Sequence, residues 1–531
     1  MKMATLLLVS SFLMFSCNKK DLSKIAAGTW NPNFAIPLAY GEFGVYDILA
    51  VTDSLDELAI DSETGLISLI YSGELYNLQT NDFFTLNDVS TSFNANLLDF
   101  GMTPQLVFNQ TVNASLDETI TFNLNGHELH ELLFKDGSLN VNLSSDFQHN
   151  LTAVITFPGM TRNGNVVSET INLPYTGGTS TENLSIDLEN VLSNFNTTGT
   201  PNQLAIEIEL TLEGTGNEVV GTENVSISIN LNNLDFIHFR GLISPEEVNF
   251  TDSISIRLFD AVTDGTFSFT NPKITFSISN GFGIPMRIDF NELKSIRKSS
   301  GEEYPLTGFT NELTISSPVT IGDEITTELL INKSNTSNLG QIFGSTPNYF
   351  YYDLDLNVNP NGVMAPLHFM ARNSELRLSA EVDLPLEGFA YGFEFRDTLD
   401  FETGEDFEDA EAIKFVMFRL IIENGFPVDI DAQINFMDEN HNILFAAFST
   451  VEDIVRSGQV NAAGKVIATT RKISDITLEE AEIQLLNQVK YFEIHALGQT
   501  KNGPTEQTVR IHDDCILKTQ LSMQIEASQS L

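Results

Sequence analysis

Apolar and polar residues alternate with a period of two along most of this chain, and this pattern constrains the fold more than any other feature. The alternation is clear at residues 119–124, 204–210 and 352–358, and Gly, Asn, Asp and Pro bound such segments. Successive side chains of a strand point to opposite faces, so a period of two is typical of half-buried antiparallel strands. We therefore expect a mainly β chain built from tandem antiparallel β-sandwich (Ig-like) modules with short helices.

Short helical patterns interrupt these strands. The segments with helical spacing of apolar residues are 126–134, 190–195, 338–343, 408–414 and a longer one at 478–488. Brief helices between strands are compatible with a mainly β chain.

Similar strand starts recur at Asp117, Asp252 and Asp397. Each is followed by two strands joined by a turn, and a further strand comes later, at Leu204, at Phe350 and at Tyr491. Self-similarity at a fixed spacing indicates repeated structural units. The sequence predicts an N-terminal β-rich region at 30–114 and β modules at 115–247, 248–394 and 395–531.

Two of the turns contain Asn-Gly followed by Phe, at Asn280-Gly281 and Asn424-Gly425. Asn-Gly is typical of tight turns because both residues tolerate positive φ. We expect both glycines to have positive φ, and we expect Phe282 and Phe426 to close one end of a core. The alternative is that these strings form binding loops.

The N-terminus has the pattern of an export signal. Lys2 precedes an apolar run at 3–15, followed by Ser16 and Cys17. A charged start, a short apolar core and a small residue before the cut are typical of a secretory signal peptide, and the run is shorter than the roughly 20 residues of a spanning helix. A cysteine after the cut favours a lipoprotein signal over an ordinary secretory one. We expect a lipoprotein signal peptide at 1–16, lipid attachment at Cys17 and a tether at 17–29.

The segments 30–38, 47–49 and 65–71, together with this signal, resemble an uncharacterised family of Bacteroidota lipoproteins. That resemblance implies a lipid anchor and no particular activity. The strand–Asn-Gly-Phe-Pro–strand units resemble the Ig-like sandwiches of late-embryogenesis-abundant (LEA14-type) domains. This second resemblance implies a fold and no function.

Charge and cysteine content exclude some functions. The chain has 27 Lys and Arg against 72 Asp and Glu, a net charge of −45, which repels nucleic acid. Its cysteines are Cys17 and Cys515, so with Cys17 lipidated no disulfide framework is possible. The acidic neighbours of Cys515 favour a structural thiol over a nucleophile.

No segment has the pattern of a catalytic or metal site. His127 and His130 are spaced one residue too closely for a zinc-protease helix, although His149 is a conceivable third ligand. Residues 353–362 superficially resemble a calcium loop but lack its Gly and Glu positions, and a strand is the better interpretation. We found no nucleophile elbow, phosphate loop or dinucleotide fingerprint. We expect no catalytic residue, no metal site, no cofactor and no enzyme activity.

These features favour a non-enzymatic outer-membrane lipoprotein that acts in binding, adhesion or as a scaffold in the cell envelope. One alternative is a lipoprotein that binds a glycan or an apolar ligand, and another is a secreted hydrolase with unrecognised carboxylates. The expected partners are the membrane, through the lipid anchor, and an unidentified protein or glycan. The location is exported, at either the cell surface or the periplasmic face of the outer membrane.

Overall fold

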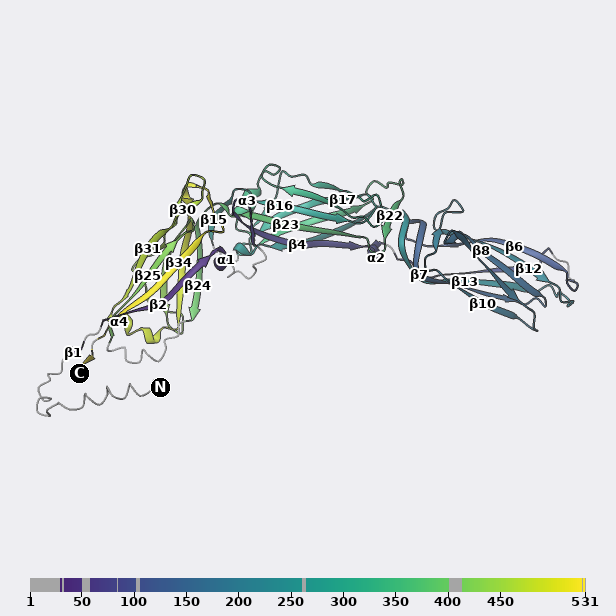
Figure 1. The fold of residues 1–531 in the computed structure, drawn as a ribbon, viewed down its shortest axis with the longest axis horizontal. Coiled ribbons are helices and arrows are strands. Elements are labelled where there is room, and N and C mark those ends of the chain that lie inside the picture. The colour runs from purple at the N-terminus through teal and green to yellow at the C-terminus, as the bar shows by residue number, and fades with distance from the viewer. Residues whose placement is uncertain are drawn as a thin grey trace, which may run out of the picture.

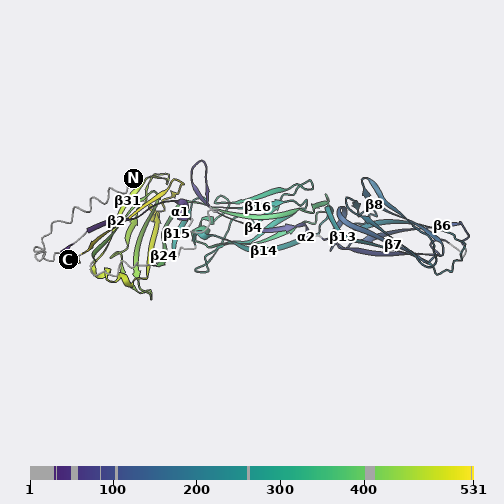
Figure 2. The same ribbon diagram turned by 60° about the horizontal axis from the view of Figure 1, so that its bottom comes forward.

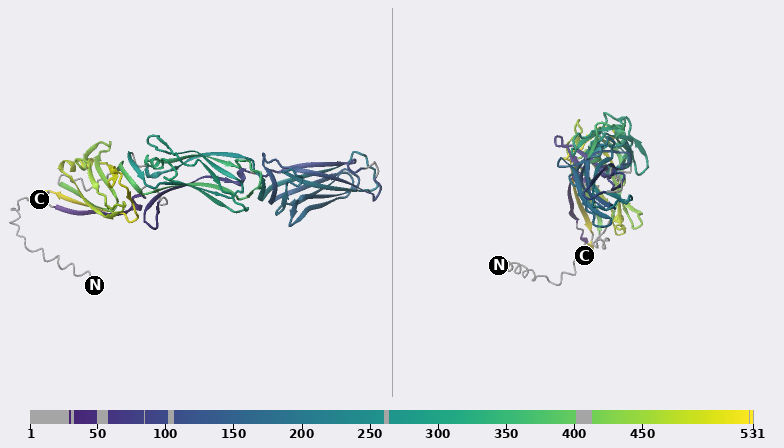
Figure 3. Two further views of the ribbon diagram at one scale, coloured as in Figure 1. Left: turned by 90° about the horizontal axis from the view of Figure 1, so that it is seen from above. Right: turned by 90° about the vertical axis from the view of Figure 1, so that its right-hand side faces the viewer.

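In the computed structural model, the chain forms three β-sandwiches arranged end to end in a long rod (Figure 1). The described residues are 29–30, 33–49, 58–83, 85–101, 106–259, 264–400, 413–527 and 529–530. Nearly all of the elements are antiparallel strands, so the predicted fold class is confirmed. We call the sandwiches base, middle and tip; β2 and β24 lie in the base, and β6 lies in the tip at the other end (Figure 2). Viewed end on, the sandwiches overlie one another along the rod (Figure 3).

The tip is a ten-stranded sheet that folds into two layers. The layers are β10-β7-β13-β5 and β6-β12-β8-β9, and β11 pairs with both β7 and β8. The strands are β5 (Val89–Asn96), β6 (Thr111–Thr121), β7 (Glu128–Ser145), β8 (Asn150–Arg162), β9 (Asn165–Leu173), β10 (Ser180–Asp187), β11 (Leu192–Asn194), β12 (Gln203–Glu213) and β13 (Asn224–Leu242).

The middle sandwich has the layers β20-β16-β23-β4-β3 and β14-β21-β17, and β18 and β19 pair with β17. Its strands are β3 (Leu58–Ile60), β4 (Ile67–Gln79), β14 (Glu246–Ser255), β16 (Lys273–Asn280), β17 (Met286–Ile296), β18 (Glu303–Pro305), β19 (Glu312–Ile315), β20 (Ile325–Ile331), β21 (Tyr349–Val358) and β23 (Glu375–Pro385). Strand β22 (His368–Ala371) pairs with β13 of the tip.

The base has the layers β2-β34-β25-β31 and β15-β24-β32-β26, and the latter also carries β27, β28 and β33. Its strands are β2 (Asn33–Gly44), β15 (Asp264–Phe269), β24 (Glu387–Asp400), β25 (Ile413–Asn424), β26 (Val428–Met437), β27 (Ile443–Ala446), β28 (Glu452–Val455), β31 (Thr470–Leu478), β32 (Tyr491–Thr500), β33 (Val509–Arg510) and β34 (Ile516–Ala527). The pairs β29–β30 (Gln459–Val460, Val466–Ala468) and β1–β35 (Thr29–Trp30, Gln529–Ser530) stand apart.

The helices are short. They are α1 (Val45–Leu49), α2 (Thr80–Phe83), η4 (Arg257–Phe259), α3 (Leu339–Gly344), α4 (Glu480–Ile483), η7 (Leu486–Gln488) and η8 (Gly503–Thr505).

Corresponding strands occupy the same positions in the three sandwiches. One layer reads β10-β7-β13-β5 in the tip, β20-β16-β23-β4 in the middle and β31-β25-β34-β2 in the base. The facing layer reads β6-β12-β8, β14-β21-β17 and β24-β32-β26. The strands expected at Leu204, Phe350 and Tyr491 are β12, β21 and β32, the central strand of that trio each time. The first strands of the trio begin at Thr111, Glu246 and Glu387, compared with the expected module starts of 115, 248 and 395.

The N-terminal range 30–114 is distributed over all three sandwiches. Strand β2 pairs with β34 in the base, β4 with β23 in the middle and β5 with β13 in the tip. Each of these strands extends the layer that begins at β31, β20 or β10. An open strand edge exposes unpaired N–H and C=O groups, and a further strand satisfies them. The N-terminal range therefore adds strands to the base, the middle and the tip in that order, and the rest of the chain then forms most of the tip, the middle and the base in the reverse order.

Two of the expected helices are strands. Segment 126–134 is the start of β7, where a register shift at His130 separates buried Leu129 and Leu132 by three residues and so imitates helical spacing. Segment 190–195 contains β11, and its buried residues do follow a period of two. Helices are present in the expected segments 338–343 and 478–488, as α3 and as α4 with η7. Most of the expected helix at 408–414 lies outside the described residues, and β25 begins at Ile413.

The expectation of positive φ at Gly281 and Gly425 is wrong, because neither glycine has that conformation. Close approach of a neighbouring strand requires glycine at position 425 instead, whereas position 281 has room for a Cβ. A Cβ on Gly425 would lie 2.8 Å from the carbonyl oxygen of Ile516, whereas one on Gly281 would lie 3.4 Å from that of Glu375.

The asparagine before each of these glycines is buried and shapes the turn. Asn424 Oδ1 accepts the N–H of Phe426 at 2.8 Å, and Asn280 Oδ1 accepts that of Phe282 at 2.9 Å. In the tip, Ser145 takes the same place by accepting the N–H of Phe147. These side-chain acceptors replace a backbone turn bond, and the following phenylalanine is buried in each case.

Candidate functional site

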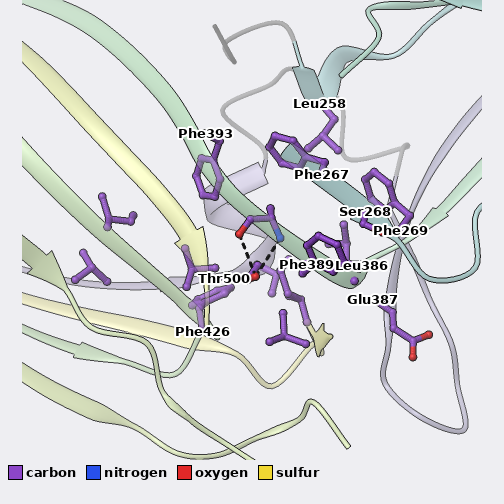
Figure 4. A pocket seen from close by; sticks show the side chains of 18 of the residues that line it. Leu258, Phe267, Ser268, Phe269, Leu386, Glu387, Phe389, Phe393, Phe426 and Thr500 are labelled. Atoms are coloured by element: carbon purple, nitrogen blue, oxygen red, sulfur yellow. Dashed lines mark hydrogen bonds between the residues drawn. The ribbon is translucent and has the colours of Figure 1, made fainter. Parts of the chain in front are cut away.

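An apolar cavity of about 270 Å³ lies between the two layers of the base, at the end next to the middle sandwich (Figure 4). One wall comes from β15, β24, β26, β28 and β33, and the other from β34, α1 and the end of β25. The cavity is partly open to solvent. It coincides with an interruption of the core: most buried apolar residues of the tip and middle form one continuous group that also includes Phe269 of β15, whereas most of those of the base fall into three smaller groups, one of which includes Ile67 of β4.

Aromatic and aliphatic side chains line most of this cavity. They are Val45, Leu258, Phe267, Phe269, Leu386, Phe389, Ala390, Phe393, Phe426, Val428, Ile430, Val455, Val509, Ile511 and Leu517. Phe267 and Phe393 lie with their ring centroids 5.6 Å apart. A side chain at Gly498 would collide with the ring of Phe393, so the glycine leaves room for this wall.

Three of the four polar side chains of the wall, those of Thr500, Asn424 and Glu387, are bonded within the protein, and the fourth is Ser268. Thr500 Oγ1 accepts the N–H of Ala390 at 3.0 Å and donates to its carbonyl oxygen at 3.1 Å (Figure 4). Asn424 Nδ2 donates to the carbonyl oxygens of Val428 and Arg456 at 3.0 and 2.9 Å. The carboxylate of Glu387 accepts from Arg510 Nη2 at 2.6 Å. The interior therefore offers mainly apolar contact to a ligand.

A second, more polar hollow of about 400 Å³ adjoins the cavity. Phe267 and Ser268 of β15 line both spaces. The other residues of the hollow are Tyr304, Gly340, Gln341, Gly344 and Ser345, which come from β18 and from α3 and its C-cap.

Lys333 lies beside the walls of both spaces. Its Nζ donates to the carbonyl oxygen of Phe269 at 2.7 Å, and its Cε would be 3.1 Å from a Cβ on Gly340. Burial lowers the pKa of Lys333, and the carboxylate of Glu387 opposes that shift. The Lys333 side chain thus lies next to Phe269, which lines the cavity, and next to Gly340, which lines the hollow.

The far end of the tip exposes apolar side chains on its loops. Leu98, Val107, Phe108 and Val220 are 83%, 61%, 71% and 71% exposed. Their loops follow β5 and β12 and precede β6 and β13, and the pairs Asn96–Asn224 and Thr111–Glu213 bring those strand ends together. Exposed apolar residues grouped on loops mark candidate contact surfaces.

Some of the residues considered from sequence lie outside the described part of the chain, and others have structural partners. Cys17 and the acidic run 402–411 are not among the described residues. Cys515 is buried, and burial raises the pKa of its thiol, as expected for a structural cysteine.

The histidines considered as metal ligands have separate partners. His127 Nε2 lies 3.2 Å from Glu246, and His130 Nε2 lies 3.2 Å from Glu128. His149 is at the opposite end of the tip, where its Nδ1 contacts Thr215 at 3.2 Å. Across the described ranges, no group of three or more His, Cys, Asp or Glu side chains could hold a metal ion.

The calcium-like stretch is a strand, as its alternation indicated. Asp353 and Asp355 lie on β21, and their carboxylates accept hydrogen bonds from the Asn249 amide at 2.9 and 2.8 Å. Asn249 lies on β14, the neighbouring strand of the same layer.

A raised carboxyl pKa would be expected at a hydrolytic site. The pKa of Asp431 is raised by burial and by the carboxylates of Asp453 and Asp429. Asp431 and Asp453 face each other across β26 and β28, but neither lines the apolar cavity. Its one lining carboxylate, Glu387, is already paired with Arg510.

Sequence reasoning did not find the cavity, because its walls come from segments between Val45 and Leu517 that only the fold brings together. It did single out Phe426 and Asn424, which line the cavity, as parts of a turn. The exposed Phe108 and Val220 had no distinguishing local pattern.

Among the described residues, none of the helices is long and apolar enough to span a membrane.

Comparisons with known proteins give few leads. No protein-family model matches the chain, and no curated protein matches it. Among solved structures, a predicted secreted protein from Parabacteroides distasonis, a member of the Bacteroidota, is 12% identical. The match covers 66% of this chain and 99% of that chain with a TM-score of 0.17. The VP2 subviral particle of infectious bursal disease virus is 10% identical over 90% of this chain and 86% of that chain, with a TM-score of 0.12. At these TM-scores neither likeness says what this chain does.

Proposed function

We propose that this chain is a non-enzymatic outer-membrane lipoprotein that holds a contact surface, the tip, away from the membrane. Lipidated Cys17 anchors the base, and residues 17–29 form the tether. The observation that carries the proposal is the path of the N-terminal segment. Strand β2, which follows the tether, lies in the base, and the chain reaches the tip only at β5 (Figure 1).

The hydrogen bonds at the boundary between the tip and the middle sandwich support the proposal of a stiff rod. Here the linker 243–245 is bonded on several sides. The N–H of Ile243 donates to His368 Nδ1 at 3.0 Å, and its carbonyl oxygen accepts from Asn359 Nδ2 at 2.8 Å. The N–H of Ser244 donates to His127 Nδ1 at 3.1 Å. A linker with so many of its backbone groups bonded to side chains resists bending.

The boundary between the middle and the base is bonded in a comparable way. The N–H of Leu386 donates to the carbonyl oxygen of Ile67 at 2.7 Å, and its carbonyl oxygen accepts the N–H of Ile511 at 3.0 Å. Ile67 belongs to the N-terminal strand β4, so that strand ties the boundary together.

We also propose that the three sandwiches are tandem repeats of one unit. Their common strand order supports this, as does the matching turn at Ser145, Asn280 and Asn424. Repetition lengthens a rod without requiring a new fold.

The contact surface is the group of exposed apolar residues Leu98, Val107, Phe108 and Val220 at the tip. An unidentified protein or glycan at the cell surface or in the periplasm is the proposed partner. Absence of enzyme activity is supported by the apolar cavity walls and by the paired state of Glu387.

The test is fractionation of cells that produce the wild-type chain or Cys17→Ala. The wild type should remain with the outer membrane, because acyl chains contribute about 0.8 kcal/mol per buried CH₂. The variant should appear in the soluble fraction or as an uncleaved precursor. A correctly processed Cys17→Ala chain that still sediments with membranes would refute the anchor. Protease treatment of intact wild-type cells then distinguishes a surface location from a periplasmic one.

The alternative function, binding of an apolar ligand, is favoured by one specific observation, the cavity in the base.

A further inference from the structure

The base contains a space that the described side chains do not fill. Protein interiors are normally packed as densely as organic crystals, and atoms that line a void lose dispersion contacts. Most buried apolar residues of the tip and middle form one continuous core, whereas most of those of the base form three smaller groups, and residues of two of these groups line the cavity of about 270 Å³. The base therefore has room for a guest between its layers.

The walls define the chemistry of such a guest. Phenylalanine, valine, leucine and isoleucine side chains form most of the surface, and Thr500, Asn424 and Glu387 have partners within the protein. A buried polar group of the ligand would be left without a hydrogen bond, which costs about 1–3 kcal/mol. The buried part of the guest must therefore be hydrocarbon.

The size and surroundings of the cavity narrow the choice further. The cavity volume lies just below the roughly 300–1,000 Å³ of pockets for drug-sized ligands, which suits one hydrocarbon chain of a ligand better than two. Phe267 and Ser268 line both the cavity and the polar hollow, and the Lys333 ammonium is bonded to the neighbouring Phe269 carbonyl. A ligand whose hydrocarbon chain lies in the cavity thus has space for an anionic head group in the hollow.

We propose that the base binds a single-chain amphiphile with an anionic head. The hydrocarbon chain lies between Phe267, Phe393 and Phe426, and the head lies in the hollow beside Lys333. This site is independent of the anchor at Cys17 and of the contact surface at the tip. Free fatty acids and single-chain phospholipids share the required chemistry.

The experiment is titration calorimetry on the mature chain from residue 18 onward, purified without acyl groups. Dodecanoate and lysophosphatidylglycerol are the two anionic probes, each used below its aggregation concentration, and dodecanol is the neutral probe. Both anionic probes, or one of them, should bind at one site per chain, and the tighter one indicates the source of the natural ligand. If neither anionic probe binds the wild type, the proposal is wrong.

A matched pair of variants locates the site. Val455 lines the cavity from β28, whereas Val451 is exposed just before that strand. Val455→Phe should fill the cavity and weaken binding by at least about tenfold, while Val451→Phe should bind like the wild type. Equal affinities for all three chains would overturn the proposal, as would an equal loss in both variants. If Val455→Phe melts early, Val428→Phe fills the same cavity from β26.

Lys333→Met tests the position of the head, because methionine keeps the apolar stem and removes the charge. It should weaken the binding of dodecanoate by about tenfold and leave dodecanol unaffected. Lys298→Met, on an exposed turn of the middle sandwich, is the control. Unchanged dodecanoate binding by Lys333→Met would refute the placement of the head, even if the chain still binds in the cavity.

Discussion

His368 Nδ1 accepts the backbone N–H of Ile243 at 3.0 Å, and this hydrogen bond joins β22 to the linker between the tip and the middle sandwich. Both residues are buried. Because Nδ1 accepts this hydrogen bond, Nδ1 itself must be unprotonated, and burial lowers the pKa of His368 below its ordinary value. This hydrogen bond at the boundary between the tip and the middle therefore depends on a neutral imidazole.

The first prediction concerns the pH dependence of that boundary. A histidine with a lowered pKa in the folded state contributes stability above its unfolded pKa of about 6.5, and this contribution is lost as the pH falls toward the folded value. The wild type should therefore lose more unfolding free energy between pH 7.5 and 5 than His368→Gln, by up to about 1.4 kcal/mol per pH unit over the shifted range. Denaturant titrations at several pH values measure the difference. Parallel curves for the two chains would show that His368 does not titrate with unfolding.

The second prediction concerns the glycines of the two corresponding turns. A Cβ at position 425 would lie 2.8 Å from the Ile516 carbonyl oxygen, whereas at 281 its nearest contact would be an ordinary 3.4 Å. Gly425→Ala should therefore destabilise the base by about 1–3 kcal/mol, and Gly281→Ala should have a smaller effect on the middle sandwich. Calorimetry on the full mature chain compares them. A larger effect at Gly281 would contradict the close-approach explanation.

These glycines show how far the sequence could lead. The Asn-Gly-Phe strings correctly marked corresponding turns, but the reason for glycine at position 425 is the neighbouring strand β34, which lies far away along the chain. The prediction of a helix at 126–134 was wrong for a related reason. Pairing of β7 with β13 introduces a register shift, and the resulting local spacing of apolar residues imitates that of a helix. Alternation predicted β12 and β21 well because it reflects which face is buried.

The distribution of 30–114 could not be predicted from local patterns. A strand such as β5 has the same alternation whether it pairs with its sequence neighbours or with β13, more than a hundred residues later. The choice depends on which sheet edge is open in the folded chain. The cavity was hidden for the same reason, because residues as distant as Val45 and Leu517 line it.

The third prediction tests that distribution. Ala95 of β5 is fully buried in the core of the tip. Ala95→Asp should bury a charge and destabilise the tip by more than about 2 kcal/mol, although the residue lies in the N-terminal range. Hydrogen exchange should show lost protection in β12 and unchanged protection in β32. Normal protection of β12 in this variant would mean that β5 does not belong to the tip. The exposed neighbour Asn94, replaced by Asp, is the control.

The fourth prediction concerns the contact surface. Phe108→Ser and Val220→Ser remove exposed apolar side chains and should change stability by less than about 0.5 kcal/mol. Together they should lower the yield of cross-linked partner in intact cells by about tenfold, as loss of a central contact does. Val319→Ser, 91% exposed on the middle sandwich, is the matched control and should have no effect. Equal cross-linking by all the variants would place the partner elsewhere on the rod.

The most direct test of the account is the distance of each end of the rod from the membrane. Cys515→Ser leaves a lipidated chain to which one labelling cysteine is added, either Val220→Cys in the tip or Glu526→Cys in the base. Energy transfer from the label to acceptor lipids in reconstituted vesicles should be strong from position 526 and nearly absent from position 220. Comparable transfer from both positions would show that the rod lies flat or is anchored elsewhere, and it would contradict a base held at the membrane with the tip held away.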